Sequence, residues 1–252
     1  MTASEFLIKL VAPPRCAGCG KRFDIVNQDR VGAFCDKCRA EWEKAKISVC
    51  EGCGHESAAC ICSGKYLKGT RILSVIKFGK VPCCDRLIYA LKQRRVAKFF
   101  DFAADELYRR LCEEEKLTVT DLSDAIITNV PRNERTRRAF GFDHAEILAE
   151  SVAELMSARY ESLLGRRFGG RPQKNLNESD RGKNVRGRFF VRSDEPIVGE
   201  RIILVDDVMT TGATASECVN ELRRCGASEV IVLTLARTEN KKSKKQNVER
   251  RK

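Results

Sequence analysis

The segment spanning residues 201–225 constrains the fold of this chain more than any other part of the sequence. It opens with five residues, 201–205, of which four are aliphatic, and this pattern is typical of a strand buried on both faces of a parallel sheet. Two carboxylates, Asp206 and Asp207, follow at once, and a loop of small residues and a helical pattern come after them. The order of strand, acidic pair, loop and helix predicts an α/β domain with the acidic pair at the carboxyl end of a strand.

The loop after the acidic pair is suited to a phosphate and consists of Thr210, Thr211, Gly212, Ala213 and Thr214. The free backbone N–H groups at the start of the following helix carry the positive end of its dipole. Gly212 lets the backbone close around a ligand, and the threonine hydroxyls add donors without adding charge. Because carboxylates accept hydrogen bonds from vicinal hydroxyls, the segment predicts a phosphosugar site. The alternative is a buried strand that ends in a solvated turn, whose Asp and Thr side chains only cap a helix.

This segment closely resembles the PRPP-binding motif of type I phosphoribosyltransferases, an aliphatic run followed by D-D-x-x-x-T-G-x-T. The resemblance implies a Rossmann-like parallel sheet. It also implies that Asp206 and Asp207 hold the ribose 2′- and 3′-hydroxyls, that the loop holds the 5′-phosphate, and that Mg²⁺ accompanies PRPP. Sites of this type also serve regulators, so the motif alone does not establish catalysis.

A cysteine-rich module precedes this domain. Its first half has two C-x-x-C pairs separated by fifteen residues, which is the spacing of a zinc ribbon: Cys16, Cys19, Cys35 and Cys38. Two such knuckles supply the four thiolates of a tetrahedral zinc site with little strain, and four thiolates leave no open position for water. The predicted role of this zinc is therefore structural. The alternative is four reduced structural cysteines.

A second cysteine set follows: Cys50, Cys53, Cys60 and Cys62. Its C-x-x-C-G start repeats the first half, which predicts a duplicated ribbon and a second zinc, with His55 as a substitute ligand and an iron–sulfur cluster as the alternative cofactor. Metal ligation explains most of the thirteen cysteines better than disulfides do, because a phosphosugar site implies cytosolic metabolites. The remaining cysteines are interpreted as core or surface thiols: Cys83, Cys84, Cys112, Cys218 and Cys225.

Charge and hydropathy narrow the functional class further. The chain has 47 Lys and Arg against 35 Asp and Glu, a net charge of +12, which favours polyanionic partners or simply serves solubility around a phosphate site. No apolar run reaches the roughly 18 residues that span a bilayer, and the N-terminus lacks the features of a signal peptide, so we expect a cytoplasmic protein. We expect a double zinc-ribbon module at 1–66, a phosphoribosyltransferase-like domain at 67–238 and a basic, disordered tail at 239–252.

The chain between the ribbon and the acidic pair alternates strand and helix patterns. Strands are predicted at 71–78, 125–130 and 229–236, and helices include one at about 99–115. A basic loop follows the second strand, and its arginines are candidates for binding pyrophosphate: Arg132, Arg135 and Arg138. The alternative for each is a solvated side chain. His144, in the same stretch, is interpreted as marking a helix start rather than a catalytic base.

The cysteine module, the segment R-R-x-F-G-F-D-H-A-E-I-L-A and the acidic pair, in this order, resemble the ComF/GntX family of competence-associated proteins. That family joins a zinc-ribbon head to a phosphoribosyltransferase-type body. The polar stretch 173–188 is similar to the family's Q-x-x-L-x(4)-R-x-x-N segment, and in type I phosphoribosyltransferases a mobile loop near this place closes over the substrate. The resemblance implies that Arg181 and Asn184 contact pyrophosphate, with a plain surface loop as the alternative.

Two functions follow as hypotheses. In the first, the chain binds PRPP or a related phosphoribosyl ligand with Mg²⁺ and, if it is an enzyme, displaces pyrophosphate from ribose C1, in DNA uptake or nucleotide salvage. In the second, it is a non-catalytic accessory that binds single-stranded DNA or a competence partner. The ribbon offers few aromatic rings on which bases could stack: Phe23, Phe34 and Trp42. The acceptor substrate and the oligomeric state stay open.

Overall fold

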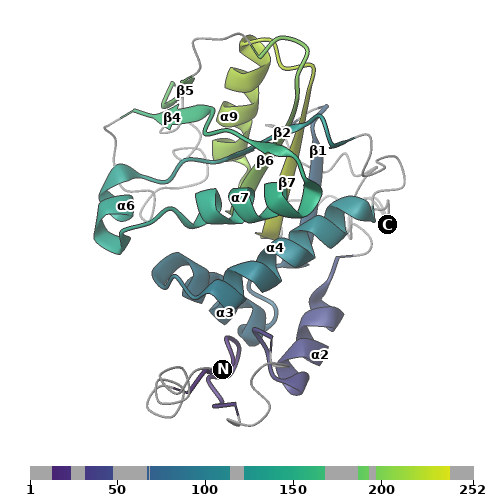
Figure 1. Ribbon diagram of the computed structural model, residues 1–252, viewed down its shortest axis with the longest axis vertical. Helices are drawn as coiled ribbons and strands as arrows, with labels where there is room; N and C mark the ends of the chain where they lie inside the picture. The colour runs from purple at the N-terminus through teal and green to yellow at the C-terminus, as the bar shows by residue number, and fades with distance from the viewer. Residues whose placement is uncertain are drawn as a thin grey trace, which may run out of the picture.

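The computed structural model describes residues 13–23, 32–47, 67, 69–113, 122–167, 187–192 and 197–238. Its centre is a five-stranded sheet with the strand order β1-β7-β6-β2-β3, in which all four pairings are parallel (Figure 1). The strands span Arg71–Lys77 (β1), Ile126–Asn129 (β2), Arg159–Tyr160 (β3), Arg201–Met209 (β6) and Glu229–Arg237 (β7). The predicted α/β class with a parallel sheet is confirmed.

Strand β6 is the central strand and is longer than the aliphatic run predicted. Its pairing with β7 continues through Asp206, opposite Thr234, as far as Met209, opposite Arg237. Its pairing with β2 ends earlier, where Asn129 lies opposite Val205. The acidic pair therefore lies inside β6 on one side and beyond the end of β2 on the other, which opens the sheet edge toward a ligand.

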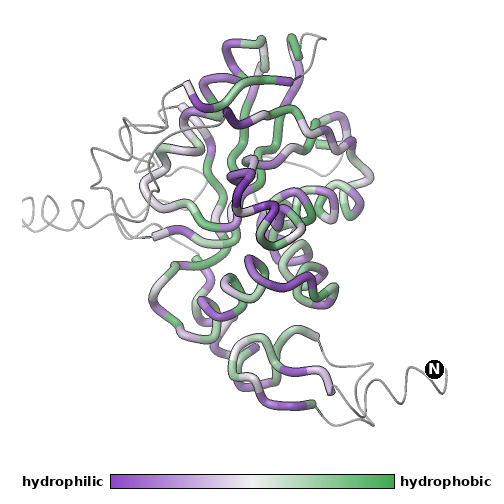
Figure 2. The backbone as a smooth tube through the Cα atoms, turned by 90° about the vertical axis from the view of Figure 1, so that its left-hand side faces the viewer, coloured by the Kyte–Doolittle hydropathy of each residue, from purple (hydrophilic) through white to green (hydrophobic). Residues whose placement is uncertain are grey.

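Helices cover both faces of the sheet, and successive residues of β6 point to opposite faces. Ile203 and Val205 pack in one hydrophobic cluster with the helices Ala97–Cys112 (α4) and His144–Met156 (α7). Ile202 and Leu204 pack in a second cluster with the helix Ala213–Arg224 (α9). The helix Pro82–Gln93 (α3) packs beside α4, and the short helix Glu134–Phe140 (α6) follows β2. In Figure 2 hydrophobic backbone runs through the middle of this part of the molecule, as expected for strands with two buried faces.

A small antiparallel hairpin packs against α9. Its strands are Leu164–Arg166 (β4) and Phe189–Val191 (β5), and Gly165 lies opposite Phe190. A Cβ atom on Gly165 would collide with the ring of Phe190, so only glycine lets this ring lie flat across the hairpin. Figure 1 shows the hairpin beside α9, at the opposite end of the molecule from the N-terminal segment.

The N-terminal segment shares its core with the sheet domain. The helix Asp36–Ala45 (α2) buries Trp42 completely, and the rings of Trp42 and Phe34 lie 5.2 and 5.1 Å from the ring of Phe102 on α4. The indole N–H of Trp42 donates to Glu106 of α4 at 2.8 Å, and Lys46 Nζ lies 2.9 Å from the same buried carboxylate. An aromatic core and a buried ion pair therefore support the fold of this segment independently of any metal.

Several sequence predictions fall outside the described residues. These are the second cysteine set (Cys50, Cys53, Cys60, Cys62) with His55, the loop residues Arg181 and Asn184, and the tail 239–252. In the part of the chain that is described, no helix is both long and apolar enough to cross a membrane.

Candidate phosphosugar site and cysteine cluster

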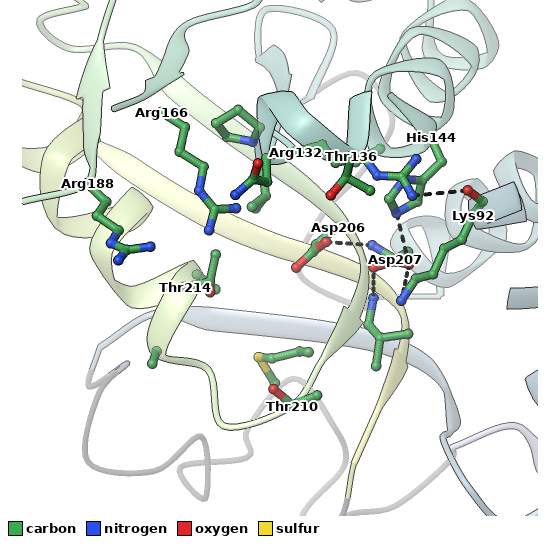
Figure 3. Close-up of a pocket in the computed structure, with 18 of the residues that line it drawn as sticks. Lys92, Arg132, Thr136, His144, Arg166, Arg188, Asp206, Asp207, Thr210 and Thr214 are labelled. Atoms are coloured by element: carbon green, nitrogen blue, oxygen red, sulfur yellow. Dashed lines mark hydrogen bonds and ion pairs between the residues drawn. The ribbon is translucent and has the colours of Figure 1, made fainter. Parts of the chain in front are cut away.

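A pocket of about 970 Å³ lies at the carboxyl ends of the sheet strands (Figure 3). It brings together most of the residues that the sequence nominated from two distant loops: Arg132, Arg135, Asp206, Asp207, Thr210, Gly212, Ala213 and Thr214. Thr211 is not part of the lining, and its hydroxyl accepts a hydrogen bond from the Ala213 N–H at 3.4 Å. Arg138 is not part of it either, since its exposed side chain pairs with Glu134 at 3.2 Å.

The loop before α9 has the geometry of an anion cradle. Gly212 caps the helix in the left-handed conformation, with φ of +76°, and the first turn of α9 contains no acidic residue. The positive end of the helix dipole is therefore not neutralised within the helix itself. Thr210 and Thr214 flank this helix start and line the pocket.

Replacing Gly212 by alanine is expected to cost about 1–2 kcal/mol, because an L-residue is strained in the left-handed region. The added Cβ would also lie 3.1 Å from Leu67 Cδ1. Gly199→Ala is the matched control, since Gly199 has a φ of +80° and nothing within 4 Å of an added Cβ. Urea unfolding should show a similar loss for both variants, with an additional loss for Gly212→Ala. Equal losses would show that Leu67 does not crowd the loop.

The two carboxylates of the motif have different surroundings. Asp207 is buried, and its Oδ2 atom lies 2.7 Å from Lys92 Nζ and 2.9 Å from His144 Nε2. Its Oδ1 atom accepts a hydrogen bond from the Val208 N–H at 2.7 Å. Burial alone would raise the pKa of Asp207, but the hydrogen bond and charge of His144 and the ion pair with Lys92 hold this pKa well below its usual range.

Asp206 is the carboxylate that faces the pocket. Its side chain is partly exposed, and its Oδ1 atom accepts a hydrogen bond from the Asp207 N–H at 2.9 Å. Burial against the sheet and the charge of Asp207 raise the pKa of Asp206 well above its usual range. The motif therefore provides one carboxylate held by protein cations and one that is available to a ligand.

Sequence reasoning did not assign Lys92 or His144 to the site. His144 does begin a helix, as predicted, and Asp143 caps that helix by accepting the Ala145 N–H at 3.0 Å. The His144 ring nevertheless also reaches Asp207, and its Nδ1 atom is buried without a hydrogen-bond partner. Lys92 lies in the last turn of α3. No local sequence pattern paired either residue with Asp207.

Arg132 has structural contacts as well as a place in the pocket. Its backbone N–H donates to Asp143 at 2.8 Å, and its guanidinium donates to the carbonyl oxygens of Lys92 at 3.1 Å and Phe142 at 3.4 Å. The guanidinium also lies 4.8 Å from the centre of the Phe140 ring. Arg132 thus ties the end of α3 to the loop before α7, in addition to lining the pocket. Three further arginines, not predicted from the sequence, line the same pocket: Arg166, Arg167 and Arg188.

The four cysteines of the first ribbon half lie together, with their sulfur atoms all within 4.8 Å of one another. Cys19 Sγ lies 3.7 Å from Cys35 Sγ. A tetrahedral zinc with sulfur ligands at 2.3 Å requires sulfur separations of about 3.8 Å, so this cluster fits zinc. Burial alone would raise the pKa of Cys16, but hydrogen bonds from backbone N–H groups lower it to about 7, whereas burial raises the pKa of Cys38.

The cluster rests on the first turns of α3. Cys83 Sγ lies 3.7 Å from the Cys38 carbonyl oxygen, and the Arg86 guanidinium donates to the Gly18 carbonyl oxygen at 2.9 Å. A Cβ on Gly18 would lie 2.8 Å from both Cys38 Sγ and Cys83 Cβ, so glycine permits this close approach. Cys83 and Cys84 are buried, as predicted for core thiols.

Comparison with known proteins identifies the class. A family model described as "Phosphoribosyl transferase domain" matches residues 144–251. The DNA utilization protein YhgH of Salmonella typhimurium is 29% identical over 211 residues, covering 81% of this chain and 90% of that protein. Competence protein F of Haemophilus influenzae is 29% identical over 133 residues, covering 52% and 58%. An orotate phosphoribosyltransferase of Bradyrhizobium is 45% identical over 42 residues, covering 17% and 23%.

The sheet, the strand–acidic pair–loop–helix segment and this domain match together define a protein with the type I phosphoribosyltransferase fold. Within that class the chain is similar to the DNA utilization protein YhgH and to competence protein F, in agreement with its sequence resemblance to the ComF/GntX family.

Proposed function

We propose that this pocket binds PRPP, or a related phosphoribosyl ligand, together with Mg²⁺. The observation that carries the proposal is the placement of Asp206 beside the positive start of α9 in one cavity. The 5′-phosphate would lie on the loop 210–214 at the helix start, and the ribose hydroxyls would donate to Asp206. Asp207 would not contact the ligand. Its contacts with Lys92 and His144 would hold the end of β6 in place.

Mg²⁺ would be held by Asp206 together with phosphate oxygens, because the partners of Asp207 already surround its carboxylate. Such an ion supplies charge neutralisation for a departing pyrophosphate. Arg132, which follows β2, and Arg135, in α6, would supply more of it, whereas Arg138 lies outside the pocket lining. Arg181 and Asn184 keep the role implied by the family resemblance, as part of this proposal.

If the protein catalyses transfer, the bond between ribose C1 and a pyrophosphate oxygen breaks and a bond from C1 to a nitrogen nucleophile forms. The bonding electrons leave with pyrophosphate, and positive charge develops on the ribose ring. Asp206 would stabilise that charge, and the arginines would stabilise the leaving group. This chemistry needs no covalent protein intermediate.

The relatives' names connect the site with the handling of DNA. Because those proteins are called DNA utilization protein and competence protein F, we propose that ligand binding here serves DNA uptake or nucleotide salvage in the cytoplasm. Zinc at Cys16, Cys19, Cys35 and Cys38 would be structural, and a second zinc would require Cys50, Cys53, Cys60 and Cys62. The domain boundaries 1–66, 67–238 and 239–252 are part of this proposal.

The second candidate function, binding of single-stranded DNA through the ribbon, is favoured by the net charge of +12. The structure reduces its support, because Phe34 and Trp42 are buried in the core and cannot stack on bases. Steep salt dependence of DNA binding that survives substitution of Asp206 would favour this second function.

The test of the proposed function is calorimetric titration of PRPP with Mg²⁺ into the wild type and into Asp206→Asn. Asparagine keeps the acceptor for the Asp207 N–H but loses the charge that the ribose hydroxyls would use. The affinity should fall about 10- to 100-fold, as expected for hydrogen bonds to a charged group. Arg138→Ala is the control and should bind normally. Equal affinities for wild type and Asp206→Asn would refute the assignment.

Asp206→Asn is expected to stabilise the folded protein, although it should weaken ligand binding. Because the folded protein raises the pKa of Asp206, the wild type loses stability as pH rises above about 4 toward that raised pKa. Asp206→Asn should therefore melt higher than the wild type at pH 7, by about 2–4 °C for about 1 kcal/mol. The difference should vanish below about pH 4, where Asp206 is neutral in both the folded and unfolded chains. A melting temperature that is lower at pH 7 would contradict this account.

A further inference from the structure

Two arginines of the β4–β5 hairpin lie over the start of α9. Arg166 is the last residue of β4, and Arg188 directly precedes β5. Both line the pocket together with Thr214 and Asp206. Figure 3 shows them on the Thr214 side of Asp206, away from Lys92 and His144. They therefore adjoin the part of the pocket assigned to the 5′-phosphate rather than the cations that hold Asp207.

This arrangement gathers positive charge in one place. The guanidinium of Arg166 is partly buried and lies 5.5 Å from the centre of the Phe189 ring. Burial and the neighbouring charge of Arg188 lower the pKa of Arg166. The start of α9 adds the positive end of a helix dipole, with no acidic residue in its first turn.

The carboxylates near this place have other partners. Within the described residues no carboxylate forms an ion pair with Arg166. Glu217 of α9 accepts the Gly187 N–H at 3.2 Å, and Glu221 pairs with Arg224 at 2.7 Å. A half-buried guanidinium next to another guanidinium and a helix start costs free energy unless an anion lies between them.

We propose that Arg166 and Arg188 form a clamp over the phosphate held at the start of α9, so that the 5′-phosphate contributes most of the ligand's affinity. This inference rests on the proposed phosphoribosyl site and adds a specificity element to it. The hairpin holds the two arginines in place: Gly165 packs against the ring of Phe190, and the guanidinium of Arg166 packs on the ring of Phe189. Pyrophosphate at ribose C1 would use Arg132 and Arg135 instead, so the two phosphate-binding regions are separable by mutation.

The experiment titrates ribose 5-phosphate, inorganic pyrophosphate and PRPP into wild type, Arg166→Ala, Arg166→Lys and Arg188→Ala. Arg192→Ala is the matched control, because Arg192 follows the same hairpin but is exposed, bonds to Ser162 and is not part of the pocket lining. Both alanine variants should bind ribose 5-phosphate and PRPP about 10- to 100-fold more weakly, whereas pyrophosphate affinity should stay within about two-fold. Arg166→Lys should recover part of the lost affinity. Arg192→Ala should bind all three ligands as tightly as the wild type does. Thermal melting of each variant confirms that it is folded.

The outcomes separate this inference from the proposed function. Unchanged affinity for ribose 5-phosphate in folded Arg166→Ala, or a loss confined to pyrophosphate, would overturn the clamp. If wild type binds ribose 5-phosphate through Arg166 but does not bind PRPP any more tightly, the clamp stands and the PRPP assignment fails. If PRPP binds and Asp206→Asn abolishes it while Arg166→Ala does not weaken it, the function stands and the clamp fails. If the wild type binds none of the three ligands, both the clamp and the proposed function are refuted.

Discussion

Replacing Asp207 by asparagine is expected to destabilise the protein by about 3 kcal/mol, which corresponds to a fall in melting temperature of about 6–12 °C. The reason is that Lys92 and His144 both converge on one buried carboxylate oxygen, and asparagine leaves the half-buried ammonium of Lys92 without its counter-charge. The end of β6 should also lose its fixed position, so PRPP affinity should fall more than 100-fold. Differential scanning calorimetry and ligand titration measure the two effects.

The pH dependence of this variant has a definite sign. The folded protein lowers the pKa of Asp207, so the stability it contributes is present above about pH 4 and is lost as the pH falls toward the lowered value. The gap between wild type and Asp207→Asn should therefore be full at pH 7 and should shrink below about pH 4. The opposite response is expected of Asp206→Asn, which should melt above the wild type.

A double-mutant cycle isolates the Lys92–Asp207 contact. Lys92→Met should cost stability in the wild type but much less in the Asp207→Asn background, because the ion pair is already lost there. Additive effects of the two substitutions would mean that the 2.7 Å contact contributes nothing to stability.

Replacing Cys16 and Cys19 by serine is expected to remove about one zinc per chain and to lower the melting temperature by more than about 10 °C. Two of four ligands are lost, and structural zinc supplies about 10 kcal/mol or more of binding free energy in small domains. The ribbon half is continuous with the core through Trp42 and Phe102, so the loss should lower the stability of the sheet domain too. Mass spectrometry of bound metal and thermal melting give the two readouts.

Two control variants make this test specific. Cys112→Ser replaces an exposed cysteine and should change neither readout. Cys83→Ser replaces a buried neighbour of the cluster and should lower the melting temperature while zinc is retained, because Cys83 packs against Cys38 instead of completing the four-sulfur set. Full zinc content with normal melting in the Cys16, Cys19 variant would refute the zinc site.

Those parts of the fold were predictable whose local sequence alone identifies the secondary structure. The aliphatic runs of β6 and β7 identify strands that are buried on both faces, and they do so without knowledge of a partner. The end of β6 was not predictable from that run, because Asp206 to Met209 stay in the strand only by pairing with β7. The β4–β5 hairpin has three residues in each strand, which is too short for an alternating pattern to stand out.

The residues of the local motif could be predicted from the sequence, but the contacts between distant segments that complete the pocket could not. Thr214 and Asp206 follow directly from the sequence segment, whereas Lys92 reaches Asp207 from a helix more than a hundred residues earlier. Trp42 and Glu106 likewise meet across 64 residues. Contacts of this kind depend on how elements pack, and a single sequence does not contain that information in any local pattern.

Helix α3 contacts both candidate sites of the protein, with Arg86 on the cysteine knuckle near its beginning and Lys92 on Asp207 near its end. A helix of twelve residues is a stiff rod about 18 Å long, so a shift at one end is carried to the other. If metal binding and ligand binding both favour the same position of this rod, the two equilibria are linked. Thermodynamic reciprocity then requires that a phosphoribosyl ligand strengthen zinc retention by the same factor by which zinc strengthens ligand affinity.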